Sequence, residues 1–402
     1  MSILSIIARL NIGGPAIYAI LLSGPDMEPR YRNTLVCGQI SPGEGDMTYL
    51  AREKGIKPVM VPELGRDISP LKDLSGFLAL RRIIKKQRPS IVHTHTAKAG
   101  GLGRLAALSL NIARSSHRKI RTIHTFHGHV FHSYFGSFKS MAFRLIERWL
   151  ARCTDRIIVL SPAQKRDIAS RYRIAKEEKV RIIPLGFDLN RLNESDRYRS
   201  EMRSRLFPSD DLFCLGMIGR LTAIKNVYLL LKAAAEIKRW GAIRGFHFLI
   251  IGDGDLRQEL VREVKKKGIE DYVIFTGWQK DLPPFYGALD GVVLTSRNEG
   301  TPVALIEAMA AGRPIISTRV GGVEDLLGST VIRGNGDFGV APRGILIESG
   351  DAYALARAML HLREKRDSMT GMVERARDFA MRNFSRERFI NDICSLYEEV
   401  VA

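Results

Sequence analysis

Short apolar runs alternate with amphipathic helical stretches along the chain, and this alternation limits the fold more than any other feature of the sequence. The runs are rich in Val, Ile and Leu, as in "DRIIVLS" (155–161) and "FHFLIIG" (246–252). Such strands are buried on both faces, and strand–helix alternation produces parallel sheets covered by helices. The sequence therefore predicts an α/β fold with doubly wound parallel sheets.

The alternation breaks off once and then restarts, which indicates two domains. Residues 181–211 are polar and rich in turn-forming residues, and a second series of apolar runs begins at Phe213. A chain of 402 residues is long enough to build two separate cores. We predict Rossmann-like domains over 1–187 and 188–383, with a ligand cleft at the carboxyl ends of their strands.

Two features of the sequence predict the cellular location of the protein. Its four cysteines lie far apart without a C-x-x-C pair, which argues against a disulfide framework and fits a reducing cytosol. No run approaches the ~18 apolar residues of a membrane span, and the short N-terminal run, interrupted by Arg9, reads as a buried strand instead of a signal peptide. The sequence predicts a cytoplasmic protein, soluble or peripheral to the membrane.

The net charge of +19 is concentrated in the first half of the chain. Residues 1–181 contain 31 Lys and Arg against 13 Asp and Glu, whereas residues 182–402 contain 31 against 30. This excess predicts an anionic partner: a phospholipid surface, a lipid-linked phosphate or a nucleic acid. Basic and apolar residues interleave over 136–152, as in a helix that lies on an anionic membrane. The alternative is an ordinary domain helix with a solvated basic face.

The stretch "RNEGTPVALIEAMAAGRPII" (297–316) combines a strand-to-helix turn with two glutamates. Thr301 is predicted to cap the helix, and Pro302 to occupy its first position, where an N–H is not needed. Such a turn directs free N–H groups and the positive end of the helix toward a ligand, which suits phosphate.

Glu299 and Glu307 lie on either side of the helix start. Their separation is roughly 8–12 Å at ~1.5 Å per helical residue, too far for two carboxylates to share one proton. The spacing suits a long ligand with hydroxyl groups at both ends and phosphate between them, such as a nucleotide sugar. The alternative is that both are solvated acids near a helix terminus.

Several motifs, in order along the chain, resemble one enzyme family. They are "NIGGPAIYA", "IVHTHTAKAGGLGRLAA", "HTFHGHVF", "IGRLTAIKN", "IIGDGDLRQEL", "EGTPVALIEAMAAGRPII" and "STRVGGVEDLL". Together they span nearly the whole chain and resemble the retaining family 4 glycosyltransferases of the GT-B fold, of the bacterial polysaccharide and lipopolysaccharide type. The resemblance implies two Rossmann-like domains facing a central cleft, with a C-terminal helix over 384–402 that packs back on the first, acceptor-binding domain.

The resemblance also implies a donor site in the second domain. Arg220 and Lys225 would neutralise the donor diphosphate, so that no metal cofactor is required. Glu299 would hold the transferred sugar and Glu307 the ribose. The other implied donor contacts are Gly13, Gly14, Trp278, Gln279, Gly300 and Thr301.

Two pairs of these contacts have other interpretations. Gly13 and Gly14 would let the backbone approach the diphosphate or the acceptor, and a tight turn after the first strand is compatible with that role. Trp278 and Gln279 fall where the family holds the base, and a buried core tryptophan is the alternative there.

Three histidines of the first domain are predicted to lie at the site. His127 matches the family position that contacts the transferred sugar, and it completes the implied catalytic set with Glu299, Arg220 and Lys225. His93 and His95 end the predicted strand 90–95 and are expected to face the cleft, where one of them touches the acceptor.

A metal site is the alternative for the histidine-rich stretch. His124, His127, His129 and His132 could converge on one ion. No carboxylates or cysteines accompany them, and the family needs no metal.

The function implied by the resemblance is a metal-independent, retaining hexosyltransferase that acts by front-side attack. Its donor would be a UDP or GDP sugar, and its acceptor a sugar or a polyprenyl-diphosphate-linked sugar. The basic first domain would hold it on the inner face of the cell membrane. A nucleotide-sugar epimerase of the same fold and a non-enzymatic nucleic-acid-binding protein are the rivals, and the motifs argue against both. The glycine-rich stretch 328–344 has no predicted role.

Overall fold

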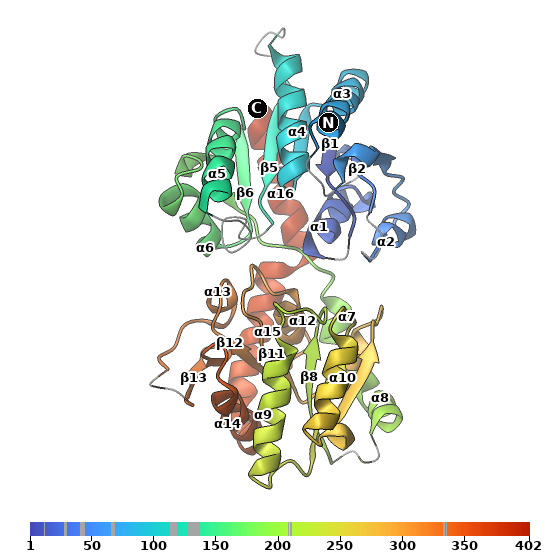
Figure 1. Cartoon of the computed structure of the whole chain (residues 1–402). Coiled ribbons are helices and arrows are strands. Elements are labelled where there is room, and N and C mark those ends of the chain that lie inside the picture. The colour runs from blue at the N-terminus through green and yellow to red at the C-terminus, as the bar shows by residue number, and fades with distance from the viewer. Residues whose placement is uncertain are drawn as a thin grey trace. The chain divides into compact units, whose positions relative to one another are not determined.

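The computed structural model shows two compact units (Figure 1). The first consists of Met1–Gly186 and Arg386–Ala402, and the second of Phe187–Ser385. The sequence places these limits at 187 and 384, one and two residues away. The structure describes residues 1–11, 13–27, 30–40, 45–65, 69–112, 119–127, 137–207, 209, 211–332, 334 and 336–402.

The described part of the first unit is built on a seven-stranded sheet in the order β3-β2-β1-β4-β5-β6-β7. All neighbouring strands run parallel, as predicted. The strands are β1 (Ser2–Ile7), β2 (Arg32–Cys37), β3 (Val59–Met60), β4 (Ile91–His95), β5 (Arg121–Thr125), β6 (Arg156–Val159) and β7 (Val180–Ile182). The helices are α1 (Gly14–Leu22), α2 (Thr48–Glu53), α3 (Pro70–Gln87), α4 (Ala97–Asn111), α5 (Ser137–Arg152), α6 (Pro162–Lys165) and α16 (Arg386–Val401).

Apolar side chains cover both faces of this sheet. Leu80 and Ile84 of α3 share one core with Ile6 of β1. Ile7, the next residue along β1, instead joins Ile20 of α1 in a second core. Because successive residues of a strand point to opposite faces, a strand between two cores is apolar along its whole length. This explains the continuous apolar runs in the sequence.

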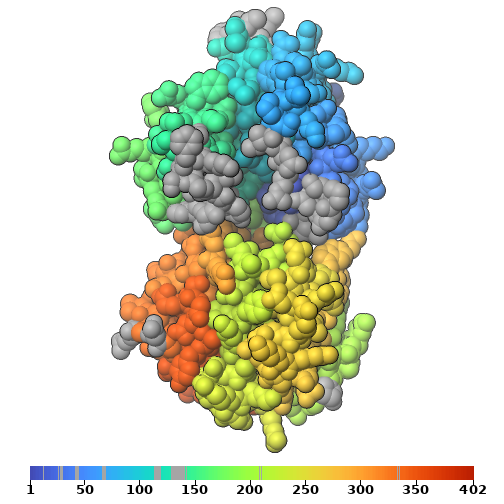
Figure 2. Space-filling model, viewed as in Figure 1, coloured from blue at the N-terminus to red at the C-terminus, as the bar shows by residue number. Residues whose placement is uncertain are grey.

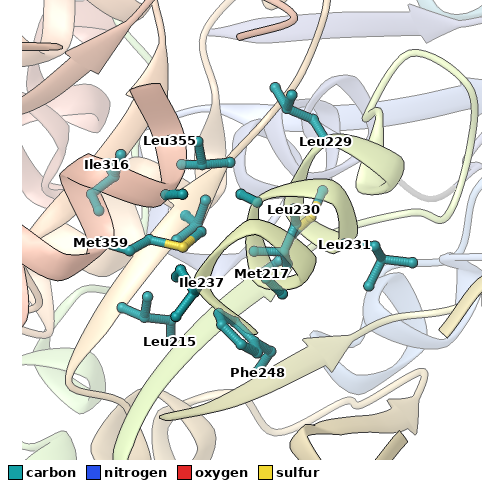
Figure 3. Packing of buried hydrophobic residues seen from close by; sticks show 14 of the residues in the cluster. Leu215, Met217, Leu229, Leu230, Leu231, Ile237, Phe248, Ile316, Leu355 and Met359 are labelled. Carbon is teal, nitrogen blue, oxygen red and sulfur yellow. The ribbon is translucent and has the colours of Figure 1, made fainter. Parts of the chain in front are cut away.

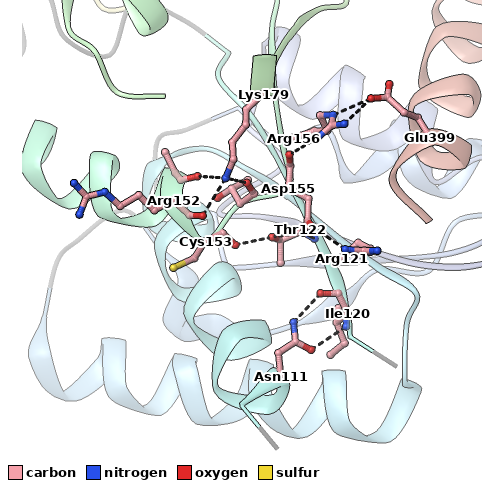
Figure 4. Close-up of polar contacts among 12 residues, drawn as sticks. Asn111, Ile120, Arg121, Thr122, Arg152, Cys153, Asp155, Arg156, Lys179 and Glu399 are labelled. Carbon is pink, nitrogen blue, oxygen red and sulfur yellow. Dashed lines mark hydrogen bonds and ion pairs between the residues drawn. The ribbon is translucent and has the colours of Figure 1, made fainter. Parts of the chain in front are cut away.

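Helix α16 returns the chain to the first unit. The Tyr397 hydroxyl lies 2.7 Å from Nδ1 of His93 on β4. At the start of β6, the Glu399 carboxylate accepts hydrogen bonds from Arg156 at 2.7 and 3.0 Å (Figure 4). The last helix is therefore part of the first unit's core and of its polar surface.

The second unit contains a seven-stranded sheet in the order β10-β9-β8-β11-β12-β14-β13. Its strands are β8 (Phe213–Ile218), β9 (Phe246–Ile251), β10 (Val273–Gly277), β11 (Gly291–Leu294), β12 (Ile315–Thr318), β13 (Phe338–Ala341) and β14 (Gly344–Ile347). Its helices are α7 (Asn190–Asn193), α8 (Arg199–Leu206), α9 (Val227–Arg239), α10 (Arg257–Lys266), α11 (Pro283–Ala288), α12 (Val303–Ala310), α13 (Val323–Leu327), α14 (Ala352–Glu364) and α15 (Thr370–Phe384).

Strand β13 is an addition to the predicted parallel pattern. It pairs antiparallel with β14, with Ala341 opposite Gly344 across a tight turn. The strand lies within 328–344, the stretch for which the sequence predicts no role. An antiparallel edge strand of this kind needs only a short turn, whereas a parallel strand needs a long crossover.

The core of the second unit lies between its sheet and helices α9 and α14. Leu230 and Ile237 of α9 and Met359 of α14 pack with Leu215 of β8 and Phe248 of β9 (Figure 3). In Figure 2, helices α9 and α10 (yellow-green and yellow) form much of the second unit's surface that faces the viewer. Full burial of one Leu, Ile, Met or Phe side chain contributes about 1.5–3 kcal/mol to stability. This packing holds the sheet edge that carries the predicted donor residues.

A buried ion pair joins α4 to α5 in the first unit. Arg104 donates from one guanidinium nitrogen to both carboxylate oxygens of Glu147, at 3.0 and 2.9 Å. Both side chains are at most 2% exposed. Charges removed from water in this way depend on each other, because neither has solvent as a substitute partner.

We expect Glu147→Gln to lower the free energy of unfolding of the first unit by about 3–5 kcal/mol, because it leaves the Arg104 charge buried and uncompensated. Denaturant unfolding followed by circular dichroism measures the change. Glu178→Gln is the control, because Glu178 belongs to an exposed pair with Lys176 and should change stability by less than about 0.5 kcal/mol. Equal effects of the two substitutions would contradict the role of the buried pair.

Candidate active site

Loops from neighbouring strands meet at the carboxyl edge of the second sheet. The Arg297 amide, after β11, donates to the Ile224 carbonyl, after β8, at 2.8 Å. The Thr295 hydroxyl donates to the carbonyls of Lys225 and Asn226, both at 3.0 Å. These bonds hold the segments that contain the predicted Lys225 and Glu299 side by side.

Two glycines allow the loop after β12 to press against the Glu299 backbone. A Cβ atom on Gly321 would lie 1.9 Å from the Glu299 carbonyl oxygen, and one on Gly322 would lie 1.9 Å from the Gly300 carbonyl oxygen. The Gly322 amide also donates to the Glu299 carbonyl at 3.1 Å. The pair "GG" in "STRVGGVEDLL" is therefore required by close backbone approach.

Lys225 and Glu299 form an ion pair at this edge. Nζ of Lys225 lies 2.6 Å from Oε1 of Glu299, and the side chains are 22% and 10% exposed. The Ser296 hydroxyl donates to the same oxygen at 2.6 Å. Ser296 was not anticipated from the sequence, where a serine at the end of a strand carries no specific signal. The arrangement sets a cation beside a carboxylate that is fixed from two sides.

Arg220 lies in the same loop as Lys225 but in a different environment. Its side chain is exposed, and within the described residues its guanidinium group forms no ion pair or hydrogen bond. Arg220 and Lys225 both lie between β8 and α9, where they would provide two cations for one anionic ligand.

Glu307 lies on α12 and pairs with a residue that the sequence did not point to. The buried Tyr286 hydroxyl, from α11, donates to Oε2 of Glu307 at 2.8 Å. Burial raises the pKa of Glu307 to about 7, and the bond from Tyr286 opposes part of this rise. The two predicted glutamates therefore differ, because Glu299 has a cationic partner and Glu307 a neutral one.

The start of α12 differs from the prediction. Pro302, not Thr301, occupies the N-cap position, and the helix begins at Val303. The Thr301 hydroxyl is buried and has no hydrogen-bond partner within the described residues. The predicted cap is wrong, because the Thr301 side chain does not bond to the first amides of the helix. Gly300 and Thr301 do lie at the helix start, as predicted.

Trp278 and Gln279 follow β10 at the same edge of the sheet. Trp278 is 50% exposed, so the alternative that it belongs to a core is wrong. Nε2 of Gln279 donates to the Thr276 carbonyl at 2.9 Å, which fixes the turn. An exposed aromatic side chain at this edge is free to stack on a ligand.

In the first unit, His95 and His127 meet at the carboxyl edge of the sheet. Nδ1 of His95, the last residue of β4, lies 3.1 Å from Nε2 of His127, two residues beyond β5. The Tyr18 ring packs edge-on against His127, with 4.9 Å between ring centroids. Burial lowers the pKa of His127 to about 3 and holds that of His95 well below its usual value. Both rings are therefore neutral at physiological pH.

Like His95, whose side chain is also fully buried, His93 does not face a ligand-accessible surface, and the prediction that both histidines face the cleft needs correction. Its side chain is 0% exposed. Nδ1 lies 2.7 Å from the Tyr397 hydroxyl, and Nε2 lies 2.7 Å from the Thr125 hydroxyl. Because both ring nitrogens have partners, the arrangement assigns His93 to the junction between the sheet and α16.

The structure gives no support to a metal site in the described part of the histidine-rich stretch. His124 is buried, and its Nδ1 lies 2.9 Å from the Thr94 hydroxyl. Among the described residues, no group of three or more His, Cys, Asp or Glu is arranged to hold a metal ion. His129 and His132 lie outside the described residues.

Gly13 and Gly14 lie at the start of α1, after the connection from β1 that begins at Ala8. Gly13 is the N-cap of α1, with φ 153°, and Gly14 is its first residue. The role predicted for these two glycines near the diphosphate or the acceptor stays a prediction. A glycine at Gly13 avoids the strain that an L side chain would have at this φ.

The chain matches two family models along its length. Residues 28–191 match the model described as Glycosyltransferase Family 4. Residues 213–365 match the model described as Glycosyl transferases group 1. The chain belongs to the glycosyltransferases of the GT-B fold. These matches confirm the resemblance inferred from the motifs, including the family 4 identity of the first unit.

Curated relatives of this glycosyltransferase carry related descriptions. The Escherichia coli UDP-Gal:alpha-D-GlcNAc-diphosphoundecaprenol alpha-1,3-galactosyltransferase is 27% identical over 89% of both chains. The Staphylococcus aureus capsular polysaccharide biosynthesis glycosyltransferase CapM is 28% identical over 72% of both chains. The predicted enzyme class, a glycosyltransferase that uses nucleotide sugars in polysaccharide synthesis, is confirmed.

Solved structures share the fold over the whole chain. Anabaena Alr3699/HepE, crystallised with UDP, superposes with a TM-score of 0.80 at 19% identity and covers 99% of this chain and 100% of its own. Sucrose-phosphate synthase from Thermosynechococcus elongatus gives 0.74 at 20% identity, with 99% of each chain covered. The predicted GT-B fold is confirmed. Along the described ranges of this glycosyltransferase, no helix has the length and apolarity needed to cross a membrane.

The raised pKa of Glu307 leads to a prediction about stability. The folded state keeps this proton up to about pH 7, whereas an unfolded glutamate releases it near 4.5. The stabilisation is present below pH 4.5 and is lost as the pH rises through about 7. Glu307→Gln cannot ionise, so its stability relative to the wild type should increase across this window and stay constant above it. The gain should be less than about 3 kcal/mol, because the half-buried group is partly screened.

Denaturant unfolding between pH 4 and 8 measures this difference. The exposed Glu364→Gln is the control and should follow the wild type at every pH. A constant difference between Glu307→Gln and the wild type would contradict the raised pKa.

Proposed function

We propose that this glycosyltransferase is retaining and metal-independent, and that it moves a hexose from a nucleotide-diphosphate sugar to a sugar or a polyprenyl-diphosphate-linked sugar. Its role would be in cell-envelope or extracellular polysaccharide synthesis. The observation that supports this most directly is the Lys225–Glu299 pair, held at 2.6 Å at the sheet edge beside the start of α12.

In the free enzyme, Lys225 neutralises Glu299. A bound diphosphate would bring negative charge to Lys225 and to the exposed Arg220, and Glu299 would then accept hydrogen bonds from the hydroxyl groups of the sugar. Charge accumulates on the diphosphate as it leaves, and fixed cations and backbone N–H groups stabilise such charge. Two cations in this position do the work that a divalent metal does elsewhere, so we propose that no metal cofactor is needed.

Retention would follow from attack on the face that the diphosphate leaves. The bond between the anomeric carbon and the phosphate oxygen breaks, and the bond to the acceptor oxygen forms on the same face. The acceptor proton passes to the leaving phosphate oxygen, so charge and atoms balance. His127 would contact the transferred sugar during this step. The paired carboxylates of a glycosidase are not required, because the leaving group itself acts as the base.

The donor base is proposed from the relatives. The galactosyltransferase relative uses UDP-Gal by its description, and the Anabaena structure contains UDP. We therefore propose a UDP-hexose donor, with the ribose at Glu307 and the base near Trp278 and Gln279. The same relative acts on a diphosphoundecaprenol-linked sugar, which supports a lipid-linked acceptor here.

A lipid-linked acceptor requires access to the membrane, and α5 has a suitable surface. Met141, Leu145 and Trp149 recur every four residues, and with Ile146 they are 47–56% exposed. Residues at this spacing share one face of a helix. Arg152 is exposed in the last turn of the same helix. We propose that this surface rests on the anionic inner face of the cell membrane, in line with the basic charge of residues 1–181.

We expect Glu299→Gln to lower the rate of sugar transfer by at least about a hundredfold, because the sugar loses its charged partner. Lys225→Ala should weaken UDP binding by about tenfold to a hundredfold, the effect of losing a charged hydrogen bond. Calorimetry with UDP, GDP and UDP-sugars, with and without EDTA, measures the second effect. The exposed Lys232→Ala is the control and should bind UDP like the wild type.

Each part of the proposal can fail separately. An active Glu299→Gln enzyme would remove Glu299 from the site. Selective binding of GDP would correct the donor, and loss of activity in EDTA would overturn metal independence. A product of inverted anomeric configuration, read by NMR, would overturn retention.

For the membrane surface, we expect Leu145→Glu with Trp149→Glu to reduce binding to phosphatidylglycerol-containing vesicles by about tenfold or more, since each exposed apolar group contributes on the order of 1–2 kcal/mol to insertion. Val340→Glu is the control, because Val340 is 51% exposed in the second unit. Vesicle co-sedimentation measures binding. Equal binding by both variants would show that α5 does not contact the membrane.

A further inference from the structure

The contact between His95 and His127 couples the protonation of two rings. One nitrogen must donate and the other accept across the 3.1 Å between Nδ1 of His95 and Nε2 of His127. A neutral imidazole carries one N–H and one lone pair. The direction of this hydrogen bond therefore decides whether the proton of each outer nitrogen is present or absent. The outer nitrogens are Nε2 of His95 and Nδ1 of His127.

Two arrangements satisfy the bond. In the first, His95 donates from Nδ1, its Nε2 is a lone pair, and His127 carries its proton on Nδ1. In the second, His127 donates from Nε2, its Nδ1 is a lone pair, and His95 carries its proton on Nε2. The total number of protons is the same in both.

The exposure of the two rings distinguishes the two arrangements. Nε2 of His95 and Nδ1 of His127 are both buried and lack a hydrogen-bond partner within the described residues. The His95 side chain is 0% exposed, whereas His127 keeps part of its surface exposed. An N–H group on Nε2 of His95 would stay unpaired, at the cost of an unsatisfied buried donor. Nδ1 of His127 is itself buried, but its ring is partly exposed, so an N–H group there is the one that water or a ligand oxygen can reach.

The surroundings also hold the His127 ring in place. Tyr18 packs on it at 85° between ring planes, and Phe389 of α16 packs on Tyr18 with 4.7 Å between centroids. His127 is therefore fixed on one side by a hydrogen bond and on another by an aromatic pair.

We infer that His95 is a positioning residue, which donates from Nδ1 to Nε2 of His127 and so makes His127 a hydrogen-bond donor, through Nδ1, to an oxygen of the bound substrates. This inference rests on the proposed role of His127 at the transferred sugar. The oxygen belongs either to a sugar hydroxyl group or to the donor phosphate.

The first test reads the tautomer directly. Protein labelled with ¹⁵N in its histidine rings is studied by NMR, and His127→Gln identifies the His127 signals. We expect the wild type to show a protonated Nδ1 on His127, and His95→Leu to show averaging between the two tautomers. A protonated Nε2 on His127 in the wild type would overturn the inference. This readout needs no substrate, so it stands apart from any failure of the proposed function.

The second test compares two amides of similar polarity. His95→Asn places its amide where Nδ1 of histidine lies, whereas His95→Gln places it near Nε2. We expect His95→Asn to keep kcat within a few-fold of the wild type and His95→Gln to lose about tenfold or more, with the donor KM unchanged in both.

Thermal unfolding of the two His95 variants provides the control for folding. Equal stability with unequal kcat supports positioning. Equal losses of kcat in both variants would show that His95 has only a structural role and would overturn the inference. An added UDP-sugar should shift the His127 Nδ1 signal if the oxygen comes from the sugar, and UDP alone should shift it if the oxygen is a phosphate oxygen. No shift with either would also overturn the inference.

Discussion

Parallel strand pairing is the constraint on which both units depend, because it brings the ends of sequence-distant strands to one edge. In the first sheet, His95 pairs in register with Thr125, so the residues that follow β5 meet those that end β4. In the second sheet, the same rule brings the loop of Lys225 to the loop of Glu299. The Lys225–Glu299 pair joins two such loops, and the His95–His127 contact joins the end of β4 to the residues after β5.

The charged site then depends on close approach of backbone to backbone. Gly321 and Gly322 lie where a Cβ atom would collide with the carbonyl oxygens of Glu299 and Gly300. Packing therefore fixes the Glu299 carboxylate before any ligand binds, and Lys225 balances the negative charge of this carboxylate. Preorganisation of this kind would limit the rearrangement required by the proposed donor binding.

Helix α16 connects the end of the chain to the histidines of the first unit. The Tyr397 hydroxyl forms a hydrogen bond with one ring nitrogen of His93. The Phe389 ring packs on Tyr18, and Tyr18 packs on His127. The two histidines of "HTH" consequently have different roles: His93 joins the sheet to α16, and His95 faces His127. Removal of α16 would be expected to disturb the site as well as the fold.

The sequence by itself determined the fold class, the two domains and the family, because apolar periodicity and ordered motifs are local signals that survive without contacts. It also predicted Lys225, Glu299 and Glu307 as donor contacts, all three through the family resemblance and the two glutamates also through their spacing around the strand-to-helix turn. Only the tertiary structure decided the partners: Tyr286 for Glu307, α16 for His93, and His95 for His127. Hydrogen bonds and burial between residues distant in sequence set these roles, and no periodic pattern encodes them.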